Sequence, residues 1–242
     1  MAIGTVRNNV GELPTEPVMN SNSVEARLRQ LTCASLCDVD KHLRFIDPGI
    51  QALNSCEKMV GRALTVKCRD DFLTVLYALS QAKAGDVLVI DGGSGKAAVT
   101  GELIATEAQR RGVCGIVIDG ACRDSATLRQ LEMPFFARSV SPMAGTSNRL
   151  GKIGVPVSCG GVVVNPEDYV MADADGIIVM SPDEVEKLLP VAEETQQADA
   201  RVFERMSAGE NLFDLLNAVE HAEALQRGDM SSKLRFATEK QK

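Results

Sequence analysis

Residues 86–140 read DVLVIDGGSGKAAVTGELIATEAQRRGVCGIVIDGACRDSATLRQLEMPFFARSV, and this stretch decides the fold class. The apolar runs at 87–90, 116–118 and 135–137 are short and bounded by turn residues, which predicts strands. Residues 101–111 and 125–131, which lie between these runs, have helical patterns. Strands that alternate with helices in this way are typical of an α/β protein.

The alternation begins before this stretch, with a predicted strand at 63–66 and a predicted helix at 72–82. A first helix is expected after Asn22, because Asn22 and Glu25 have the spacing of a capping box. Residues 1–22 are polar and contain two prolines, so we expect an irregular N-terminal segment there.

The pattern changes after Ser139, where β-branched runs are separated by Gly and Pro and no helical segment lies between them. This predicts further strands joined by turns, and therefore a mixed sheet. The sequence Ser181-Pro182-Asp183-Glu184 predicts the start of a helix, which Pro190 should break or kink. Residues 191–225 are charged and helix-prone, and residues 228–242 are expected to form a mobile tail.

The charge balance argues against nucleic acid as a partner, since 26 basic residues face 33 acidic ones and the net charge is −7. The composition, 45% hydrophobic and 24% charged, is that of an ordinary soluble globular protein. No apolar run approaches the roughly 20 residues that span a bilayer, and the N-terminus lacks a signal-peptide pattern. We therefore expect a cytoplasmic protein that does not bind membranes.

The cysteines of the chain are odd in number, lie mostly in apolar segments and form no CxxC pair: Cys33, Cys37, Cys56, Cys68, Cys114, Cys122 and Cys159. This pattern predicts reduced, buried thiols rather than a disulfide framework. A single catalytic cysteine remains open. His42 and His221 are the only histidines, which argues against a zinc site.

A dinucleotide-binding motif is suggested by Gly93, Gly95 and Ala98 after an apolar strand, with Asp119 about 20 positions later. The helix signals disagree with it, because a helix from Gly95 would carry Val99-Thr100-Gly101 in its interior. NAD binding therefore requires a helix that begins at Gly95. A phosphate-binding Walker loop is also excluded, since Ala rather than Ser or Thr follows Lys96.

Helix-end signals instead favour Thr100 as the N-cap of a helix that ends at Gly112. The first backbone amides of this helix, in Gly101, Glu102, Leu103 and Ile104, then form an anion-binding site.

Arg123 and Asp124 lie side by side after a strand expected to end at Asp119. The Arg guanidinium matches a carboxylate, and the Asp carboxylate is a hard oxygen ligand for Mg²⁺ or Mn²⁺. Together they are complementary to a 2-oxo acid bound to a metal. An alternative stays open: the two residues form a surface pair in which Asp124 only caps the helix at Ser125.

The stretch DVLVIDGG, together with residues 101–142, resembles the 4-hydroxy-4-methyl-2-oxoglutarate aldolase family, also called RraA-like. Some members carry an older label as demethylmenaquinone methyltransferase-like proteins, and the fold is shared with the ribonuclease E activity regulator. The resemblance covers roughly residues 23–210, and its densest part is Gly101-Glu102 followed by Arg123-Asp124.

The resemblance implies a single α/β domain over residues 23–227, with a mixed sheet, a swivelling β/β/α core and a C-terminal helical region. It also implies homotrimers or dimers of trimers, with active sites between subunits. The amides of residues 101–104 and the Arg123 guanidinium would bind the 2-oxo-acid end of the substrate. Asp124 would ligate the metal, and Glu102 would hold a water beside it.

A further acid would come from the C-terminal helical region of a neighbouring subunit. Family members favour Glu in that region. Here Asp199 is the best match, and Glu193, Glu194 and Glu204 are competing candidates.

The resulting prediction is a class II aldolase that uses Mg²⁺ or Mn²⁺. It would cleave 4-hydroxy-4-methyl-2-oxoglutarate or 4-carboxy-4-hydroxy-2-oxoadipate to release pyruvate, with oxaloacetate decarboxylation as a side activity. The alternative is a non-catalytic regulator that docks on an endoribonuclease. A Schiff-base aldolase that uses Lys67 or Lys96 would give the same product.

Overall fold

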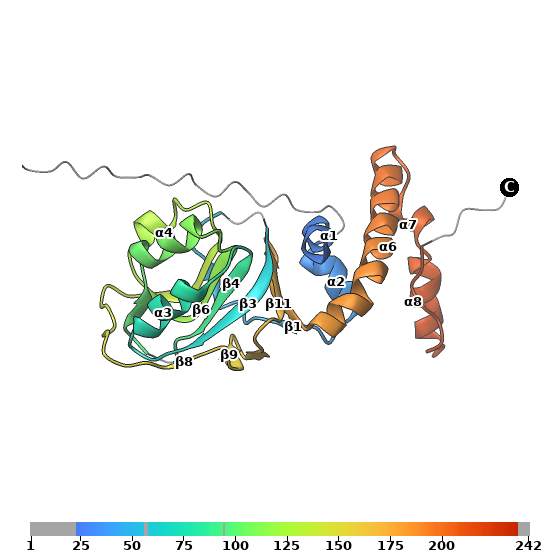
Figure 1. Cartoon of the computed structure of the whole chain (residues 1–242). Coiled ribbons are helices and arrows are strands. Elements are labelled where there is room, and N and C mark those ends of the chain that lie inside the picture. The colour runs from blue at the N-terminus through green and yellow to red at the C-terminus, as the bar shows by residue number, and fades with distance from the viewer. Residues whose placement is uncertain (1–22, 56–57, 94, 237–242) are drawn as a thin grey trace, which may run out of the picture. The chain divides into compact units, whose positions relative to one another are not determined.

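Four parallel strands form the centre of the sheet in the computed structural model, which describes residues 23–55, 58–93 and 95–236 (Figure 1). Strand β4 pairs with β3 on one side and with β6 on the other, and β7 pairs with the outer edge of β6. Their bounds are β3 (Met59–Lys67), β4 (Asp86–Asp91), β6 (Gly115–Cys122) and β7 (Phe135–Val140). The predicted α/β alternation is confirmed.

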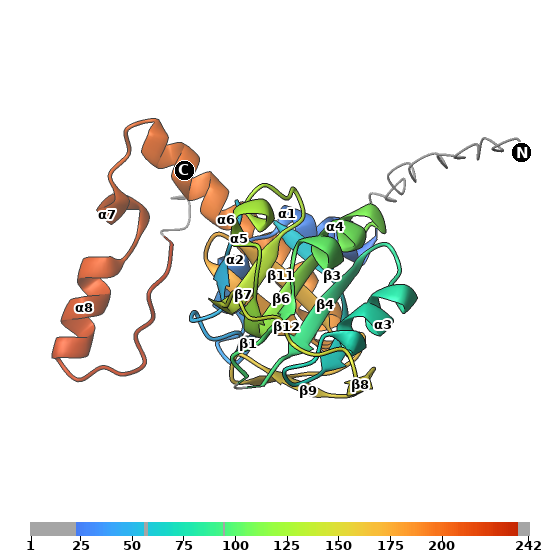
Figure 2. The same ribbon diagram turned by 90° about the vertical axis from the view of Figure 1, so that its left-hand side faces the viewer.

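Antiparallel strands extend both ends of this centre, so the predicted mixed sheet is also confirmed. The full order is β1-β12-β11-β3-β4-β6-β7-β2, with β8 and β5 pairing with β3 and β6 off this path, and the sheet curls into a half-barrel (Figure 2). Strands β9 and β10 form a separate hairpin. The bounds are β1 (Arg44–Phe45), β2 (Gln51–Ala52), β5 (Ala98–Thr100), β8 (Lys152–Ile153), β9 (Val157–Cys159), β10 (Val162–Val164), β11 (Tyr169–Asp173) and β12 (Gly176–Met180).

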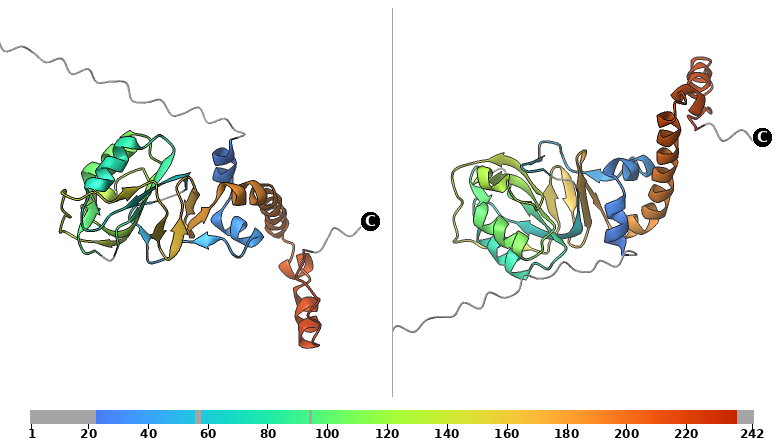
Figure 3. Two further views of the ribbon diagram at one scale, coloured as in Figure 1. Left: turned by 60° about the horizontal axis from the view of Figure 1, so that its bottom comes forward. Right: turned by 90° about the horizontal axis from the view of Figure 1, so that it is seen from above.

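Helices α3 (Leu73–Gln81), α4 (Glu102–Arg110) and α5 (Ser125–Leu128) cover one face of the central strands (Figure 2; Figure 3). Successive side chains of β4 alternate between the two faces, as the period of a strand requires. Leu88 and Ile90 pack toward the helices. Val87 and Val89 pack in the second core, against the β9–β10 hairpin and the antiparallel strands. The central strands are therefore buried on both faces, which explains why they are continuous apolar runs.

Two compact units make up the chain, Met1–Pro190 and Val191–Lys242, and helix α6 (Pro182–Ser207) runs through the boundary between them. The first unit also contains α1 (Val24–Gln30) and α2 (Cys33–Val39). The second unit contains α7 (Leu212–Leu215) and α8 (Ala218–Gln226). Among the described residues, no helix is long and apolar enough to cross a membrane.

The predicted domain limits, 23–227, stay a prediction. The predicted tail is described as far as Phe236, which bridges to Leu216, and the Asn217 side chain hydrogen-bonds the backbone of Lys233 and Arg235.

Only some of the helix ends lie where the sequence predicts them. Ser181 and Glu184 form the predicted reciprocal cap, because each side chain bonds the backbone amide of the other. The first helix differs: its N-cap is Ser23, whose hydroxyl accepts from the Ala26 amide, whereas Asn22 lies outside the described residues. Pro190 does not break α6, contrary to one of its two predicted effects.

Asp71 is a buried carboxylate that fixes the loop before β8. Its side chain, 2% exposed, accepts hydrogen bonds from the Thr146 hydroxyl and from the amides of Asn148, Arg149 and Leu73 at 2.7–3.0 Å. Burial raises the pKa of Asp71, but these hydrogen bonds outweigh burial, and the pKa lies below its ordinary value. The ionised form is therefore the one that stabilises the loop.

We predict that Asp71→Ala lowers the free energy of unfolding by about 2–4 kcal/mol, because it leaves several amides without their charged acceptor. Urea unfolding at pH 7 measures this, with the exposed Asp38→Ala as the control. The Asp71 contribution is present above the unfolded pKa of about 3.9 and is lost as the pH falls through the lower folded pKa. The stabilities of wild type and Asp71→Ala should therefore begin to converge below about pH 4 and converge further as the pH falls through the lower folded pKa. A constant difference down to pH 2 would contradict this account.

Candidate active site

Two turns meet at one edge of the sheet because β5 and β6 are parallel neighbours. Thr100 at the end of β5 is the register partner of Cys122 at the end of β6, and the Arg123 amide donates to the Thr100 carbonyl at 3.0 Å. Strand β6 therefore runs past Asp119, where it was expected to end, with a shift in register between Ile118 and Ala121. This pairing brings the residues after β5 and after β6 together.

Gly101 lies directly beneath the Arg123-Asp124 pair. A Cβ atom at Gly101 would lie 2.5 Å from Asp124 Oδ2 and 2.9 Å from Arg123 Cγ, closer than side-chain atoms approach each other. The backbone of Gly101 is extended, with φ −160°, and this residue is the N-cap of α4. The predicted N-cap, Thr100, is wrong because β5 incorporates that residue into the sheet.

Asp124 holds the N-terminus of α4, not that of α5. Its Oδ2 accepts the Glu102 amide at 3.0 Å and lies 3.4 Å from Arg123 Nε. Asp124 precedes Ser125 in the N-cap position of α5, but its side chain makes no capping hydrogen bond there. Its backbone adopts the left-handed conformation, φ 59°, which Asp tolerates better than most residues. The capping part of the alternative, in which the Asp124 side chain caps the helix at Ser125, is therefore wrong, whereas Arg123 and Asp124 do form a partly exposed ion pair.

The N-terminus of α4 has free hydrogen-bond donors. The amides of Leu103 and Ile104 have no acceptor among the described residues, while the amide of Glu102 is occupied by Asp124. The Glu102 carboxylate is exposed, and within the described residues it accepts one long hydrogen bond, from the Thr127 hydroxyl at 3.4 Å. Free amides together with the helix dipole make this end of α4 a suitable site for an anion.

A hollow of about 330 Å³ opens beside this helix end. Its polar side is formed by Thr100, Gly101, Arg123 and Asp124, and its apolar side includes Phe72, Leu76, Leu103 and Ala144. The side chains of Arg123 and Asp124 are 43% and 35% exposed, so both can reach a ligand in the hollow. Phe72 and Leu76 come from α3 and its N-cap, and no local motif marks them as site residues.

The carboxylates here suit a metal that keeps water among its ligands. The described residues contain no group of three or more His, Cys, Asp and Glu side chains arranged to hold a metal ion. Mg²⁺ is commonly held by one or two carboxylates and several waters. Asp124 Oδ1 has no hydrogen-bond partner in the described part of the chain, and Glu102 lies next in sequence to Gly101. The donor set thus fits Mg²⁺ or Mn²⁺ and does not fit a closed protein cage.

The lysines considered for Schiff-base chemistry do not line this hollow. Lys67 is paired with Asp91 at 3.5 Å, and Lys96 lines a different depression.

Because α4 begins at Glu102 and not at Gly95, the condition for dinucleotide binding is not met. The four acids proposed to reach a neighbouring subunit, at positions 193, 194, 199 and 204, lie on α6 in the second unit.

Four of the described cysteines are buried. Burial raises the pKa of Cys122 to about 11 and the pKa of Cys68 and Cys159 to about 12, so these thiols are not ionised near neutral pH. The six described cysteines are free, and Cys56 lies outside the described residues. The expectation of buried thiols is confirmed for Cys33, Cys68, Cys122 and Cys159, whereas Cys37 and Cys114 are only partly buried.

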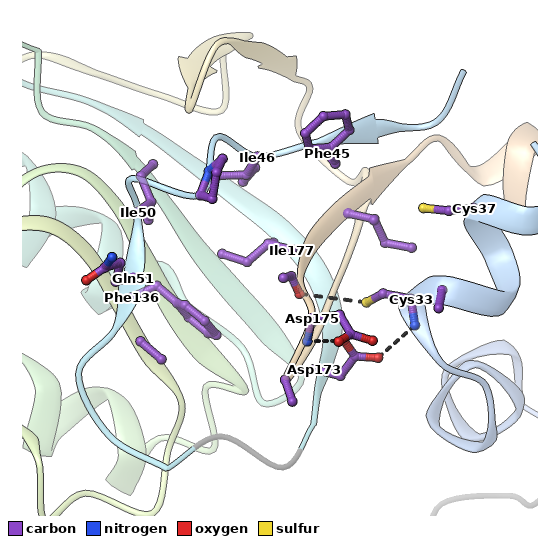
Figure 4. A pocket seen from close by; sticks show the side chains of 16 residues that line it. Cys33, Cys37, Phe45, Ile46, Ile50, Gln51, Phe136, Asp173, Asp175 and Ile177 are labelled. Atoms are coloured by element: carbon purple, nitrogen blue, oxygen red, sulfur yellow. Dashed lines mark hydrogen bonds between the residues drawn. The ribbon is translucent and has the colours of Figure 1, made fainter. Parts of the chain in front are cut away.

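A cavity of about 650 Å³ lies away from the Arg123-Asp124 pair (Figure 4). It occupies the seam of the half-barrel, between Phe45 of β1 and Phe136 of β7, and its lining is mainly apolar. Asp173 beside it already accepts the amides of Cys33 and Asp175, at 2.7 and 3.0 Å (Figure 4). No Arg or Lys lines this cavity, so it is a poor site for a carboxylate ligand.

Thr100 lines the hollow, and its buried hydroxyl has no hydrogen-bond partner among the described residues. Replacing this residue therefore tests how the unsatisfied hydroxyl affects stability. We predict that Thr100→Val leaves the thermal midpoint unchanged or raises it, since the methyl group replaces an unsatisfied hydroxyl. The matched control is Thr65→Val, which removes a 2.7 Å hydrogen bond to the Val155 carbonyl and should cost about 1–2 kcal/mol. Equal destabilisation by the two changes would contradict this description of Thr100.

The half-barrel of mixed strands carries helices on one face and an Arg-Asp pair beside a helix N-terminus that lines a hollow, and this fold defines the chain as an α/β protein. The chain belongs to the RraA-like family, described as Aldolase/RraA, whose model matches residues 33–179. The family predicted from the sequence is confirmed.

Relatives within this family carry different names. A protein of Halalkalibacterium halodurans, provisionally named 4-hydroxy-4-methyl-2-oxoglutarate aldolase, is 35% identical over 74% of this chain and 86% of its own length. The structure of RraAS2 from Streptomyces coelicolor, described as an unusual member of the RNase ES inhibitor RraA family, has 28% identity and a TM-score of 0.66 over 76% of this chain and 97% of its own. The RNA-processing inhibitor RraA from Thermus thermophilis has 28% identity and a TM-score of 0.58 over 61% and 91%.

Proposed function

We propose that this protein is a divalent-metal-dependent aldolase. It would cleave 4-hydroxy-4-methyl-2-oxoglutarate or 4-carboxy-4-hydroxy-2-oxoadipate to release pyruvate, with oxaloacetate decarboxylation as a side activity. The observation that carries this proposal is the Asp124 carboxylate held over Gly101, beside the Arg123 guanidinium and the N-terminus of α4. The name of the Halalkalibacterium halodurans relative supports the same reaction.

The 2-oxo-acid end of the substrate fits this helix terminus. A carboxylate can accept hydrogen bonds from the amides of Leu103 and Ile104 and pair with the Arg123 guanidinium. The Glu102 amide is not available for this role, because it already donates to Asp124. We therefore expect the amides of Leu103 and Ile104, and not that of Glu102, to bind the carboxylate through this helix end.

Asp124 would hold the metal, and the exposed Glu102 carboxylate would orient water close to it. A bound divalent cation supplies Lewis acidity at the 2-oxo group, where negative charge develops when the C3–C4 bond breaks. The Asp124 oxygen without a partner is the one free to serve as ligand, since Oδ2 is occupied by the Glu102 amide.

The remaining steps use residues of this chain. A water oriented by Glu102 takes the proton of the C4 hydroxyl, the C4–O bond becomes a carbonyl, and the C3–C4 electron pair moves to C3. Arg123 stabilises the resulting enolate of pyruvate by its positive charge, and C3 then takes up a proton. Loss of CO₂ from oxaloacetate produces the same enolate, so that reaction requires no additional residue.

The first experiment measures pyruvate release from 4-hydroxy-4-methyl-2-oxoglutarate and from oxaloacetate by protein treated with EDTA and then supplied with Mg²⁺ or Mn²⁺. We expect release from both substrates to return with the metal. No release from either substrate would overturn the aldolase proposal and favour a regulator that docks on an endoribonuclease, as the names of the two structural relatives suggest.

We predict that Arg123→Ala lowers kcat/KM by about 100-fold or more, because it removes the charge that stabilises the enolate. Asp124→Asn should abolish the metal-restored activity. Both proteins should keep their thermal midpoints within a few degrees, since the two side chains are partly exposed. The matched control is Arg129→Ala, at an exposed arginine just after α5, and it should retain activity. Wild-type turnover in either site variant would contradict the assignment.

A further inference from the structure

Thr100 is a polar residue at a position where the fold alone favours an apolar one. It is the last residue of β5, a strand whose three residues are all buried, and it is 3% exposed. Its hydroxyl has no hydrogen-bond partner among the described residues. A buried hydroxyl without a partner costs free energy, and Val would fill the same space without that cost. Neither the strand nor the core therefore explains a threonine at this position.

The two other threonines that are buried in the described part of the chain both form hydrogen bonds through their hydroxyls. The Thr65 hydroxyl donates to the Val155 carbonyl at 2.7 Å, and the Thr74 hydroxyl accepts the Gly151 amide at 2.8 Å. Native proteins seldom leave such a group unsatisfied without a reason. The unsatisfied hydroxyl is thus a particular feature of Thr100.

The position of Thr100 points to a ligand as the partner of its hydroxyl. Thr100 lines the hollow at Arg123, and its carbonyl accepts the Arg123 amide at 3.0 Å. Its backbone is also fixed by the register with Cys122. The amides of Leu103 and Ile104, one helical turn away at the start of α4, have no acceptor among the described residues. The same wall of the hollow therefore carries three hydrogen-bond donors without acceptors, two amides and one hydroxyl.

We propose that the Thr100 hydroxyl donates a hydrogen bond to the carboxylate of the bound 2-oxo acid, together with the amides of Leu103 and Ile104. The Thr100 oxygen is shielded from solvent, and rotation about the Cα–Cβ bond to another staggered rotamer turns it toward the hollow that the residue lines. This inference rests on the proposed function and adds a substrate-binding residue to it. Thr100 takes no part in bond cleavage.

The test is equilibrium binding of pyruvate to the full chain with Mg²⁺, measured by calorimetry for wild type, Thr100→Val and Thr65→Val. We expect Thr100→Val to bind pyruvate about tenfold or more weakly, as for the loss of a hydrogen bond to a charged group, while its thermal midpoint stays at or above that of wild type. Thr65→Val should show the reverse, a lower midpoint and wild-type affinity, because Thr65 does not line the hollow.

The kinetics of cleavage provide a second readout. A hydrogen bond to the carboxylate is present both in the bound substrate and in the transition state, so Thr100→Val should raise KM and leave kcat within about twofold. A merely structural role of Thr100 would lower the thermal midpoint and would not produce this separation of KM from kcat.

Wild-type affinity for pyruvate in Thr100→Val would overturn the proposal, and so would the absence of pyruvate binding by wild type. If Thr100→Val does not fold, Thr100→Ser and Thr100→Ala replace it, because these two variants differ only in the hydroxyl. The Ser variant should bind pyruvate about tenfold more tightly than the Ala variant, and equal affinities would also overturn the proposal.

The binding of pyruvate does not require turnover, so the two proposals fail separately. A protein that binds pyruvate through Thr100 but releases none from either substrate would refute the aldolase reaction and retain Thr100 as a carboxylate-binding residue. Pyruvate release with equal affinities in wild type and Thr100→Val would retain the aldolase and refute the role of Thr100.

Discussion

The absence of a side chain at position 101 is the constraint on which the site depends. Any Cβ atom there would collide with Asp124 Oδ2 and with Arg123, and the contact between the Asp124 carboxylate and the Glu102 amide would be lost. That contact orients the carboxylate toward the start of α4 and leaves its second oxygen free. Because position 101 is a glycine, the start of α4, the Arg123 guanidinium and the Asp124 carboxylate can lie together in a hollow large enough for a small acid.

The sheet supplies the rigidity that this contact requires. Strands β3, β4, β6 and β7 are buried on both faces, and β5 adds a short parallel strand to the end of β6. Because Thr100 and Cys122 are register partners, the turns that follow them lie side by side at the same edge of the sheet. The loop before β8 contributes Ala144 to the hollow and is anchored by Asp71, which is not itself among the residues that line the hollow.

The sequence predicts those features that arise from local periodicity. Patterns within a few residues predict the central strands and helices α3 and α4. They also predict the start of α6 at Ser181 and the additional strands after Ser139. Strand β5 escapes prediction because it has only three residues inside a glycine-rich loop, and its pairing with β6 moves the N-cap of α4 from Thr100 to Gly101. The sequence does not predict the left-handed backbone of Asp124 either, since the side chain bonds the amide of Glu102, which is distant in sequence.

The candidate site residues likewise divide into those that the sequence predicts and those that only the folded structure reveals. Gly101, Glu102, Leu103, Ile104, Arg123 and Asp124 are found by motif and resemblance, and the structure brings them together. Phe72, Leu76 and Ala144 come from elements distant in sequence, so only the folded chain assigns them to the hollow.

The measurement that tests the central claim most directly is the exchange of pyruvate methyl protons with D₂O, followed by NMR, in wild-type protein and in Gly101→Ala. Exchange reports enolate formation without requiring the natural substrate. We predict metal-dependent exchange in wild type and a loss of at least about tenfold in a folded Gly101→Ala protein, because the added Cβ displaces Arg123 and Asp124. Equal exchange in the two proteins, or exchange that persists after metal removal, would contradict the account.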